Sequence, residues 1–103
     1  MVFIESPVFT RQVLEALSDE AYAESRQRLA ARRQPGEVIP SSGGLRKMRW
    51  SIEGRGTRGG VRVIYFQVTA QARCRMLLIY RKGTQDGLSA PKEKMLRKLN
   101  EDW

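Results

Sequence analysis

Histidine is absent from this chain of 103 residues, and cysteine occurs once, as Cys74. Without histidine, the chain cannot form a Ser-His-Asp or Cys-His catalytic arrangement, and it lacks the residue that most often binds zinc or iron. A single cysteine forms no disulfide within the chain and no cysteine-based metal cluster. We therefore expect no metal and no cofactor, and a protein suited to the reducing cytoplasm.

Long hydrophobic runs are also missing. No stretch of the sequence approaches the roughly 18 apolar residues that a membrane-spanning helix needs. The first residues, MVFIESPVF, contain the acid Glu5 and no basic leader before a long apolar run. The sequence therefore predicts no signal peptide and no contact with a membrane.

Acidic residues are scarce relative to basic ones. The chain has 19 Lys and Arg against 11 Asp and Glu, which gives a formal net charge of +8. A surplus of this size on a small surface favours a polyanionic partner, above all nucleic acid. The length and the hydrophobic fraction of 41% predict one globular domain that spans residues 1–103.

Three helices are expected from caps and from apolar residues at helical spacing. Ser6-Pro7 begins the first helix, with a core-facing stripe of Phe9, Val13 and Leu17, and Leu14 beside it. Ser18-Asp19-Glu20 begins the second, which ends near residues 34–36 and turns Tyr22, Ser25 and Leu29 inward. Ser89 and Pro91 begin the third, with Met95, Leu96, Leu99 and Trp103 at helical spacing.

Strands are expected where the hydrophobic period changes to two. The segments are LRKMRWSI (45–52), GVRVIYFQV (60–68) and RCRMLLIYRK (73–82), and they follow the linker EVIPSSGG (37–44). The short connections 53–60 and 69–72 favour an antiparallel meander, and the run MVFIES (1–6) should join its edge as another strand. The predicted fold is α+β with the order β-α-α-β-β-β-α and a helical hairpin packed on one face of a small antiparallel sheet.

Glycine and positive charge gather in residues 43–66, GGLRKMRWSIEGRGTRGGVRVIYF. Gly54, Gly56 and Gly59 match the pattern G-x-G-x-x-G of dinucleotide-binding folds. That pattern requires the glycines to open a helix, whereas these lead into an expected strand. We therefore interpret the loop as a hairpin turn whose Arg55 and Arg58 can approach a phosphate chain.

Alternation within the strands sorts basic side chains onto one face. Lys47 and Arg49 share a face of their strand, while Met48, Trp50 and Ile52 lie on the other. Arg62 interrupts an apolar run, and Tyr80 and Lys82 share a face of the last strand. We expect these residues to form one basic patch on the face opposite the helices, although Lys47 and Arg49 could also be ordinary solvated charges.

The combination of GGLRKMRW, the glycine-rich loop, GGVRVIYF and LLIYRKGTQDGLS resembles the RelE/HigB superfamily of bacterial toxins, and most closely its HigB-like branch. The similarity extends from the first helix to the last. It implies a small α+β endoribonuclease that cuts mRNA in the A site of the 70S ribosome without a metal. It also implies a cognate antitoxin, a helix-turn-helix protein of the HigA type.

The resemblance also assigns roles to residues. Arg62 would stabilise the phosphorane, Lys82 matches the lysine after the last strand, and Lys47 and Arg49 match the charged positions of the L-R-K-x-R strand. A lysine among cations could act as general base, and Tyr80 could stack on a base or donate a proton. Further RNA contacts are expected at Arg46, Arg55, Arg58 and Arg81. Asp86 could orient a neighbouring cation.

Two other functions stay open from the sequence. The same architecture includes ParE-like toxins that poison DNA gyrase without cutting RNA, and a basic sheet can also serve as a plain RNA-binding module. Arg62 and Lys82 together favour a cleavage site over the gyrase toxin. The sequence does not separate a nuclease from a non-catalytic RNA-binding protein.

Overall fold

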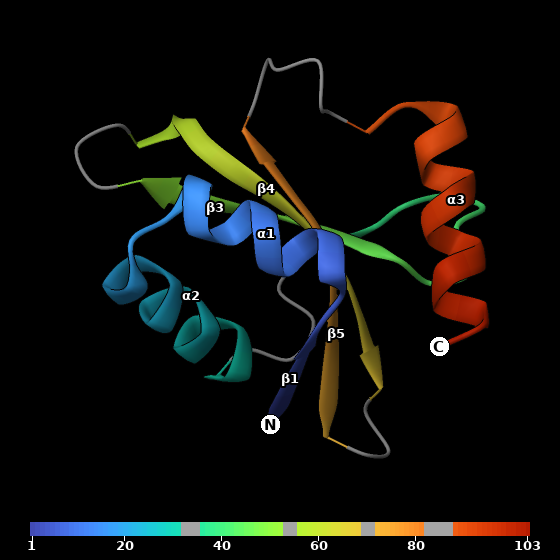
Figure 1. The fold of residues 1–103 in the computed structure, drawn as a ribbon, viewed down its shortest axis with the longest axis horizontal. Coiled ribbons are helices and arrows are strands. Elements are labelled where there is room, and N and C mark those ends of the chain that lie inside the picture. The colour runs from blue at the N-terminus through green and yellow to red at the C-terminus, as the bar shows by residue number, and fades with distance from the viewer. Residues whose placement is uncertain (32–35, 53–55, 69–71, 82–87) are drawn as a thin grey trace.

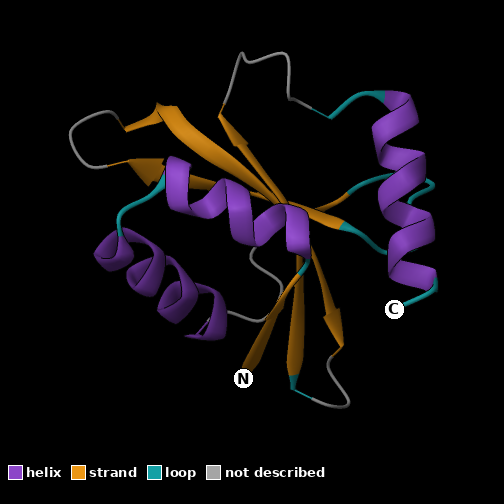
Figure 2. Ribbon diagram, in the orientation of Figure 1, coloured by secondary structure: helices purple, strands orange, loops and turns teal. Residues whose placement is uncertain are grey.

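A mixed sheet with helices on both faces forms the molecule, in a computed structural model that describes residues 1–31, 36–52, 56–68, 72–81 and 88–103 (Figures 1 and 2). Its strands are β1 (Val2–Glu5), β2 (Glu37–Val38), β3 (Arg46–Ile52), β4 (Gly56–Val68) and β5 (Arg73–Arg81). Its helices are α1 (Pro7–Ala16), α2 (Asp19–Ala31) and α3 (Ala90–Glu101). The predicted α+β class is therefore confirmed.

The strands lie in the order β1-β5-β4-β3-β2. The strands β3, β4 and β5 form the expected antiparallel meander, and β1 joins its edge as expected. The prediction that the whole sheet is antiparallel is wrong, because β1 pairs with β5 in parallel. Residues 37–44 were predicted to be a linker. That prediction is wrong for Glu37 and Val38, which form β2 and pair with β3. The sheet therefore has five strands in the described residues, one more than the predicted order contains.

Helix α1 begins where the sequence predicts. The Ser6 hydroxyl accepts a hydrogen bond from the Phe9 amide at 3.0 Å and donates one to the Leu77 carbonyl of β5 at 2.9 Å. Pro7 follows at the first helical position, where its missing N–H costs no helical hydrogen bond. One buried serine thus both caps α1 and fixes the helix to the sheet.

The two faces of the sheet carry separate hydrophobic cores. Helices α1 and α2 cover one face, which we call the hairpin face, and α3 covers part of the other, the α3 face (Figure 1). The core of the hairpin face consists of Phe9, Val13, Leu29, Met48, Trp50, Val61, Val63, Tyr65, Cys74, Met76 and Ile79. The core of the α3 face consists of Leu45, Ile64, Leu77, Leu78 and Leu96.

Two expected apolar stripes differ from the structure. On α1, Phe9 and Val13 are buried as predicted, but Leu14 is 73% exposed. On α3, only Leu96 of the predicted stripe is buried, whereas Met95, Leu99 and Trp103 are exposed. The reason is geometric, since a short helix that rests on a sheet buries one narrow row of side chains and leaves neighbouring apolar positions in solvent.

The C-terminal end of α3 is held to β5 by a polar contact. The Arg75 guanidinium donates to the backbone carbonyl and to the side-chain oxygen of Asn100, both at 3.0 Å. It also lies 5.6 Å from the ring centre of Phe66 and 5.5 Å from that of Trp103, within the range of a cation–π contact. These contacts fix how far α3 extends over its face of the sheet.

Cys74 is expected to be chemically silent in the folded protein. Its side chain is 0% exposed, and burial raises the pKa of the thiol to about 12. Because the thiolate is the reactive form, iodoacetamide at a pH of about 8 should modify the native chain roughly 100-fold more slowly than the urea-unfolded chain. Mass spectrometry of timed samples measures both rates, and equal rates would contradict the burial of Cys74.

Within the described ranges, no helix is long and apolar enough to cross a lipid bilayer.

Candidate functional site

Three polar side chains predicted to act in catalysis lie in one row across the centre of the sheet. Arg49 of β3 pairs directly with Arg62 of β4, and Arg62 pairs directly with Tyr80 of β5. Directly paired residues project from the same face of a sheet, with their Cβ atoms about 4.5–5.5 Å apart. We call Arg49, Arg62 and Tyr80 the central row.

The central row places like charges next to each other. Two arginines directly opposite on neighbouring strands repel, an arrangement that costs stability and that an anion between them would relieve. Arg62 is only 7% exposed, whereas Arg49 is exposed. The row therefore combines one shielded and one accessible arginine, and a guanidinium is in general able to hold two phosphate oxygens at once.

Lys47 lies one row further along the same face. It pairs with Ile64 on one side and with Glu37 of β2 on the other, two residues before Arg49 on β3. Glu37 is the residue that the sequence analysis missed, because its pairing with β3 depends on β2. In the described register, Glu37 is the one acidic residue directly opposite any of Lys47, Arg49 and Arg62.

Tyr80 is set up to remain neutral. Burial raises the pKa of its hydroxyl, and this effect is only partly offset by the charge of Arg62 and by a hydrogen bond from the Leu88 backbone. A neutral phenol can donate a proton but cannot accept one as a base. Within the central row, Tyr80 therefore keeps its proton at neutral pH, which is the form that a proton donor needs.

Lys47 and the central row, which together we call the basic surface, lie on the α3 face. They border the core that contains Leu78 and Leu96. Our prediction placed this patch opposite the helices. That prediction is correct for α1 and α2 but wrong for α3, which packs on the same face. The C-terminal helix therefore borders the candidate site.

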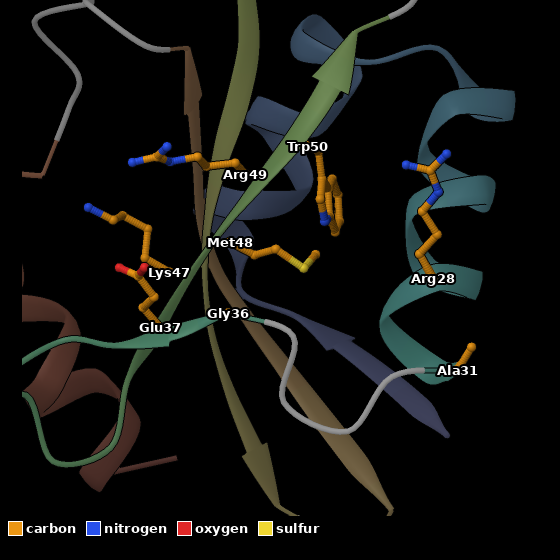
Figure 3. A pocket seen from close by; sticks show the side chains of 8 residues that line it. All are labelled: Arg28, Ala31, Gly36, Glu37, Lys47, Met48, Arg49 and Trp50. Atoms are coloured by element: carbon orange, nitrogen blue, oxygen red, sulfur yellow. The ribbon is translucent and has the colours of Figure 1, made fainter. Parts of the chain in front are cut away.

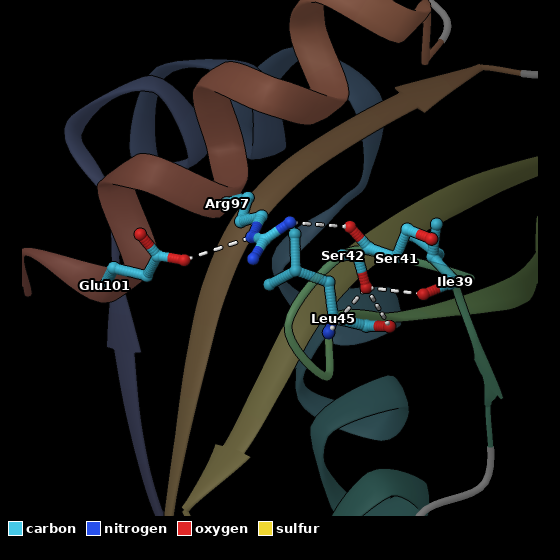
Figure 4. Close-up of polar contacts among 6 residues, drawn as sticks. All are labelled: Ile39, Ser41, Ser42, Leu45, Arg97 and Glu101. Atoms are coloured by element: carbon cyan, nitrogen blue, oxygen red, sulfur yellow. Dashed lines mark hydrogen bonds and ion pairs between the residues drawn. The ribbon is translucent and has the colours of Figure 1, made fainter.

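The turn before β3 is fixed by hydrogen bonds that also involve α3 (Figure 4). The buried Ser42 hydroxyl donates to the Ile39 carbonyl and accepts from the Leu45 amide at 3.0 Å. From α3, the Arg97 guanidinium donates to the Ser41 carbonyl at 3.1 Å. Gly43 and Gly44 have φ angles of +76° and +98°, which glycine adopts without strain. This turn fixes where β3, with Lys47 and Arg49, begins.

Gly36 anchors the other end of the linker against β3. Its amide donates to the Tyr65 hydroxyl at 2.9 Å, and its carbonyl accepts from the Arg46 guanidinium at 2.8 Å. A Cβ atom at this position would lie 2.6 Å from the Lys47 carbonyl oxygen, so only glycine fits. The close approach brings Glu37 into register with Lys47.

The remaining predicted site residues are not part of the central row. Arg46 pairs with Tyr65 and Arg81 pairs with Val61, which places both on the hairpin face, away from Arg62. The Arg46 guanidinium also donates a hydrogen bond to the Gly36 carbonyl, so Arg46 has a structural role. Lys82, Arg55 and Asp86 lie outside the described residues, and Arg58 is described only as backbone in β4.

The glycine pattern was predicted to lie in a turn before the strand, which is wrong for Gly56 and Gly59, and Gly54 lies outside the described residues. Strand β4 begins at Gly56 and contains Gly59, so these two glycines do not open a helix and do not form a dinucleotide site. In the part of the chain that the structure describes, no group of three Asp, Glu, Cys or His residues could hold a metal ion.

No protein-family model matches this chain.

Proposed function

We propose that this chain is a toxin of a type II toxin-antitoxin system, similar to the RelE/HigB superfamily, and that it acts in the cytoplasm as a ribosome-dependent endoribonuclease. The central row supports this proposal most directly, because it presents two guanidinium groups and a neutral phenol on one face of the sheet. A chain that only binds RNA needs the positive charge but has no use for a shielded Arg62 beside a proton donor.

The proposed reaction uses the RNA's own 2′-hydroxyl as nucleophile. The 2′ oxygen bonds to the adjacent phosphorus while the bond from phosphorus to the 5′ oxygen breaks, which leaves a 2′,3′-cyclic phosphate and a free 5′-hydroxyl. Charge grows on the phosphoryl oxygens in the transition state, where Arg62 and Arg49 can donate hydrogen bonds. Lys47 is the candidate to accept the proton of the 2′-hydroxyl, and Tyr80 to supply the proton of the 5′ oxygen.

Replacing Tyr80 by phenylalanine tests its role as acid. We expect the cleavage rate to fall by about 100-fold, the usual contribution of a positioned proton donor. Because the pKa of Tyr80 is raised, its acid form should persist and wild-type activity should not decline between pH values of about 7 and 9 through this group. Tyr22→Phe, a change on the hairpin face, is the matched control and should retain the wild-type rate.

The proposed function is tested with ribosomes stalled on a defined message. Adding the purified chain should produce new 5′ ends within the A-site codon, each with a free hydroxyl. If both the stalled message and free RNA remain intact, the nuclease proposal is wrong. Intact RNA with inhibited gyrase would indicate a ParE-like toxin, and binding of RNA without cleavage would indicate a plain RNA-binding protein.

The proposed antitoxin is a helix-turn-helix protein, and its gene is expected beside that of this chain. Co-expression of the two genes should yield a stable complex in which cleavage is suppressed. A neighbouring reading frame without a helix-turn-helix would remove this partner from the proposal.

Salt dependence tests whether the basic surface is the contact surface. Phosphate contacts release counterions, so binding of RNA or ribosomes should weaken steeply between about 50 and 200 mM salt. Fluorescence anisotropy of labelled RNA measures the slope of log affinity against log salt. A flat response would contradict a phosphate-binding role for Arg49 and Arg62.

A further inference from the structure

A pocket of about 690 Å³ lies at the outer edge of β3, between that strand and the end of α2 (Figure 3). Its size is within the range of ligand-binding pockets. Among the described residues, it is lined by Arg28, Ala31, Gly36, Glu37, Lys47, Met48, Arg49 and Trp50. We call it the edge pocket.

The edge pocket is continuous with the proposed RNA surface. Arg49 belongs to both, and the side chain of Lys47 lies on the same side of β3 as that of Arg49 (Figure 3). The pocket also reaches round β3 to the hairpin face, where Met48 and Trp50 contribute apolar side chains. This is possible because β2 pairs only with Arg46 and Lys47, so no described strand covers β3 beyond them.

The charges and the surface of the edge pocket suit a nucleotide. Arg28 and Arg49 contribute two positive charges against the one negative charge of Glu37, and the amine of Lys47 lines the same pocket. Arg28 pairs with Glu24 at 3.0 Å, but both side chains are largely exposed, and such a surface pair is weak enough to exchange for a phosphate. Met48 and Trp50 are 9% and 4% exposed, so the apolar part of the lining can contact the edge of a base.

We propose that the edge pocket binds one nucleobase of the RNA strand next to the cleaved bond. The RNA crosses the central row, turns over the edge of β3 at Arg49, and places one base against Met48 and Trp50, with its phosphate near Arg28. This inference rests on the proposed function and adds a binding site for one base next to the cleaved bond. An RNA strand fits better than an acidic peptide, because Arg49 pairs with Arg62 in the central row and also lines the pocket.

The test fills the pocket without touching the central row. Ala31 is an exposed residue of α2 that lines the pocket, and Ala30 is an exposed neighbour that does not. Ala31→Trp should occupy the pocket, and Ala30→Trp is the matched control with the same added volume. Thermal unfolding of both variants checks that each remains folded.

The readout is the binding of short RNAs that carry one abasic nucleotide at each position in turn. Their 2′-O-methyl groups block the nucleophile, so binding is measured without cleavage. For the wild-type chain and Ala30→Trp, one abasic position should weaken binding by roughly tenfold, as expected for the loss of one well-placed base. For Ala31→Trp, that position should no longer differ from its neighbours.

The proposed phosphate contact is tested with Arg28→Ala. This variant should bind the same RNA more weakly and with a salt slope shallower by about one, because one phosphate contact is lost. Arg11→Ala, an exposed arginine of α1 that does not line the pocket, should behave as wild type.

The outcomes separate this inference from the proposed function. An abasic profile that is flat in the wild type, or unchanged in Ala31→Trp, overturns the base subsite even if the message is cut. A profile that Ala31→Trp removes, in a chain that cuts no message, supports the subsite and overturns the nuclease. If Ala31→Trp instead blocks a polyglutamate peptide and leaves RNA binding intact, the pocket belongs to a protein partner and the inference is wrong.

Discussion

Arg62→Ala is expected to lower the rate of message cleavage by roughly 100-fold or more, the loss typical of removing one donor that stabilises transition-state charge. Arg62 lies in the middle of the central row, directly opposite both Arg49 and Tyr80, and it is 7% exposed. A phosphorane bound there would meet a guanidinium that little water competes for. The rate is measured on stalled ribosomes, per molecule of folded protein.

Two further variants make the result for Arg62 specific. Arg62→Lys keeps the charge but loses the planar, two-pronged donor, so it should recover only part of the rate. Arg73→Ala, an exposed arginine at the opposite end of β5, is the matched control and should cleave normally. A lowered melting temperature with a normal rate for Arg62→Ala would show that Arg62 is structural and has no part in the reaction.

Phe9→Ala is expected to lower the free energy of unfolding by about 3–5 kcal/mol, the cost of removing a large aromatic side chain from a packed core. Phe9 is 0% exposed, and its ring centre lies 5.9 Å from that of Tyr22, so it joins α1 to α2 over the sheet. A small domain has only about 5–15 kcal/mol of stability in total. Urea unfolding followed by tryptophan fluorescence should therefore show a large shift of the midpoint, or an unfolded chain.

Leu14→Ala is the control for Phe9→Ala on the same helix. Leu14 is 73% exposed, so its truncation should change the free energy of unfolding by no more than about 0.5 kcal/mol. A loss of several kcal/mol at Leu14 would mean that the stripe predicted from the sequence, and not the observed burial, describes how α1 packs.

Helix starts and strand faces were predictable because local chemistry sets them. Ser6 and Ser89 satisfy amide groups three residues ahead of them, as their sequence contexts predict. Strict alternation in β3 placed Lys47 and Arg49 on one face and Met48 and Trp50 on the other. These features depend on neighbours within a few residues, which a sequence displays directly.

The predictions that failed, for β2 and for the apolar stripes of α1 and α3, share a different cause. The two residues of β2 carry too little pattern to indicate a strand, and they pair with β3 only because Gly36 allows a close approach to the Lys47 carbonyl. Leu14 and Leu99 are apolar at helical spacing, yet the angle at which each helix rests on the sheet leaves both exposed. Helix orientation depends on contacts between distant segments.

The sequence by itself determined every described helix and strand except β2, most of their approximate limits and the basic character of one sheet face. Only the tertiary structure decided that Arg49, Arg62 and Tyr80 form one row. The register between β4 and β5 shifts after Ile64 of β4, so that Leu77 of β5 has no residue opposite it. As a result, Leu77 and Leu78 both lie on the α3 face. Without this shift, simple alternation from Met76 would place Tyr80 on the hairpin face. Register between strands is a non-local property, and one inserted residue reverses every side chain that follows.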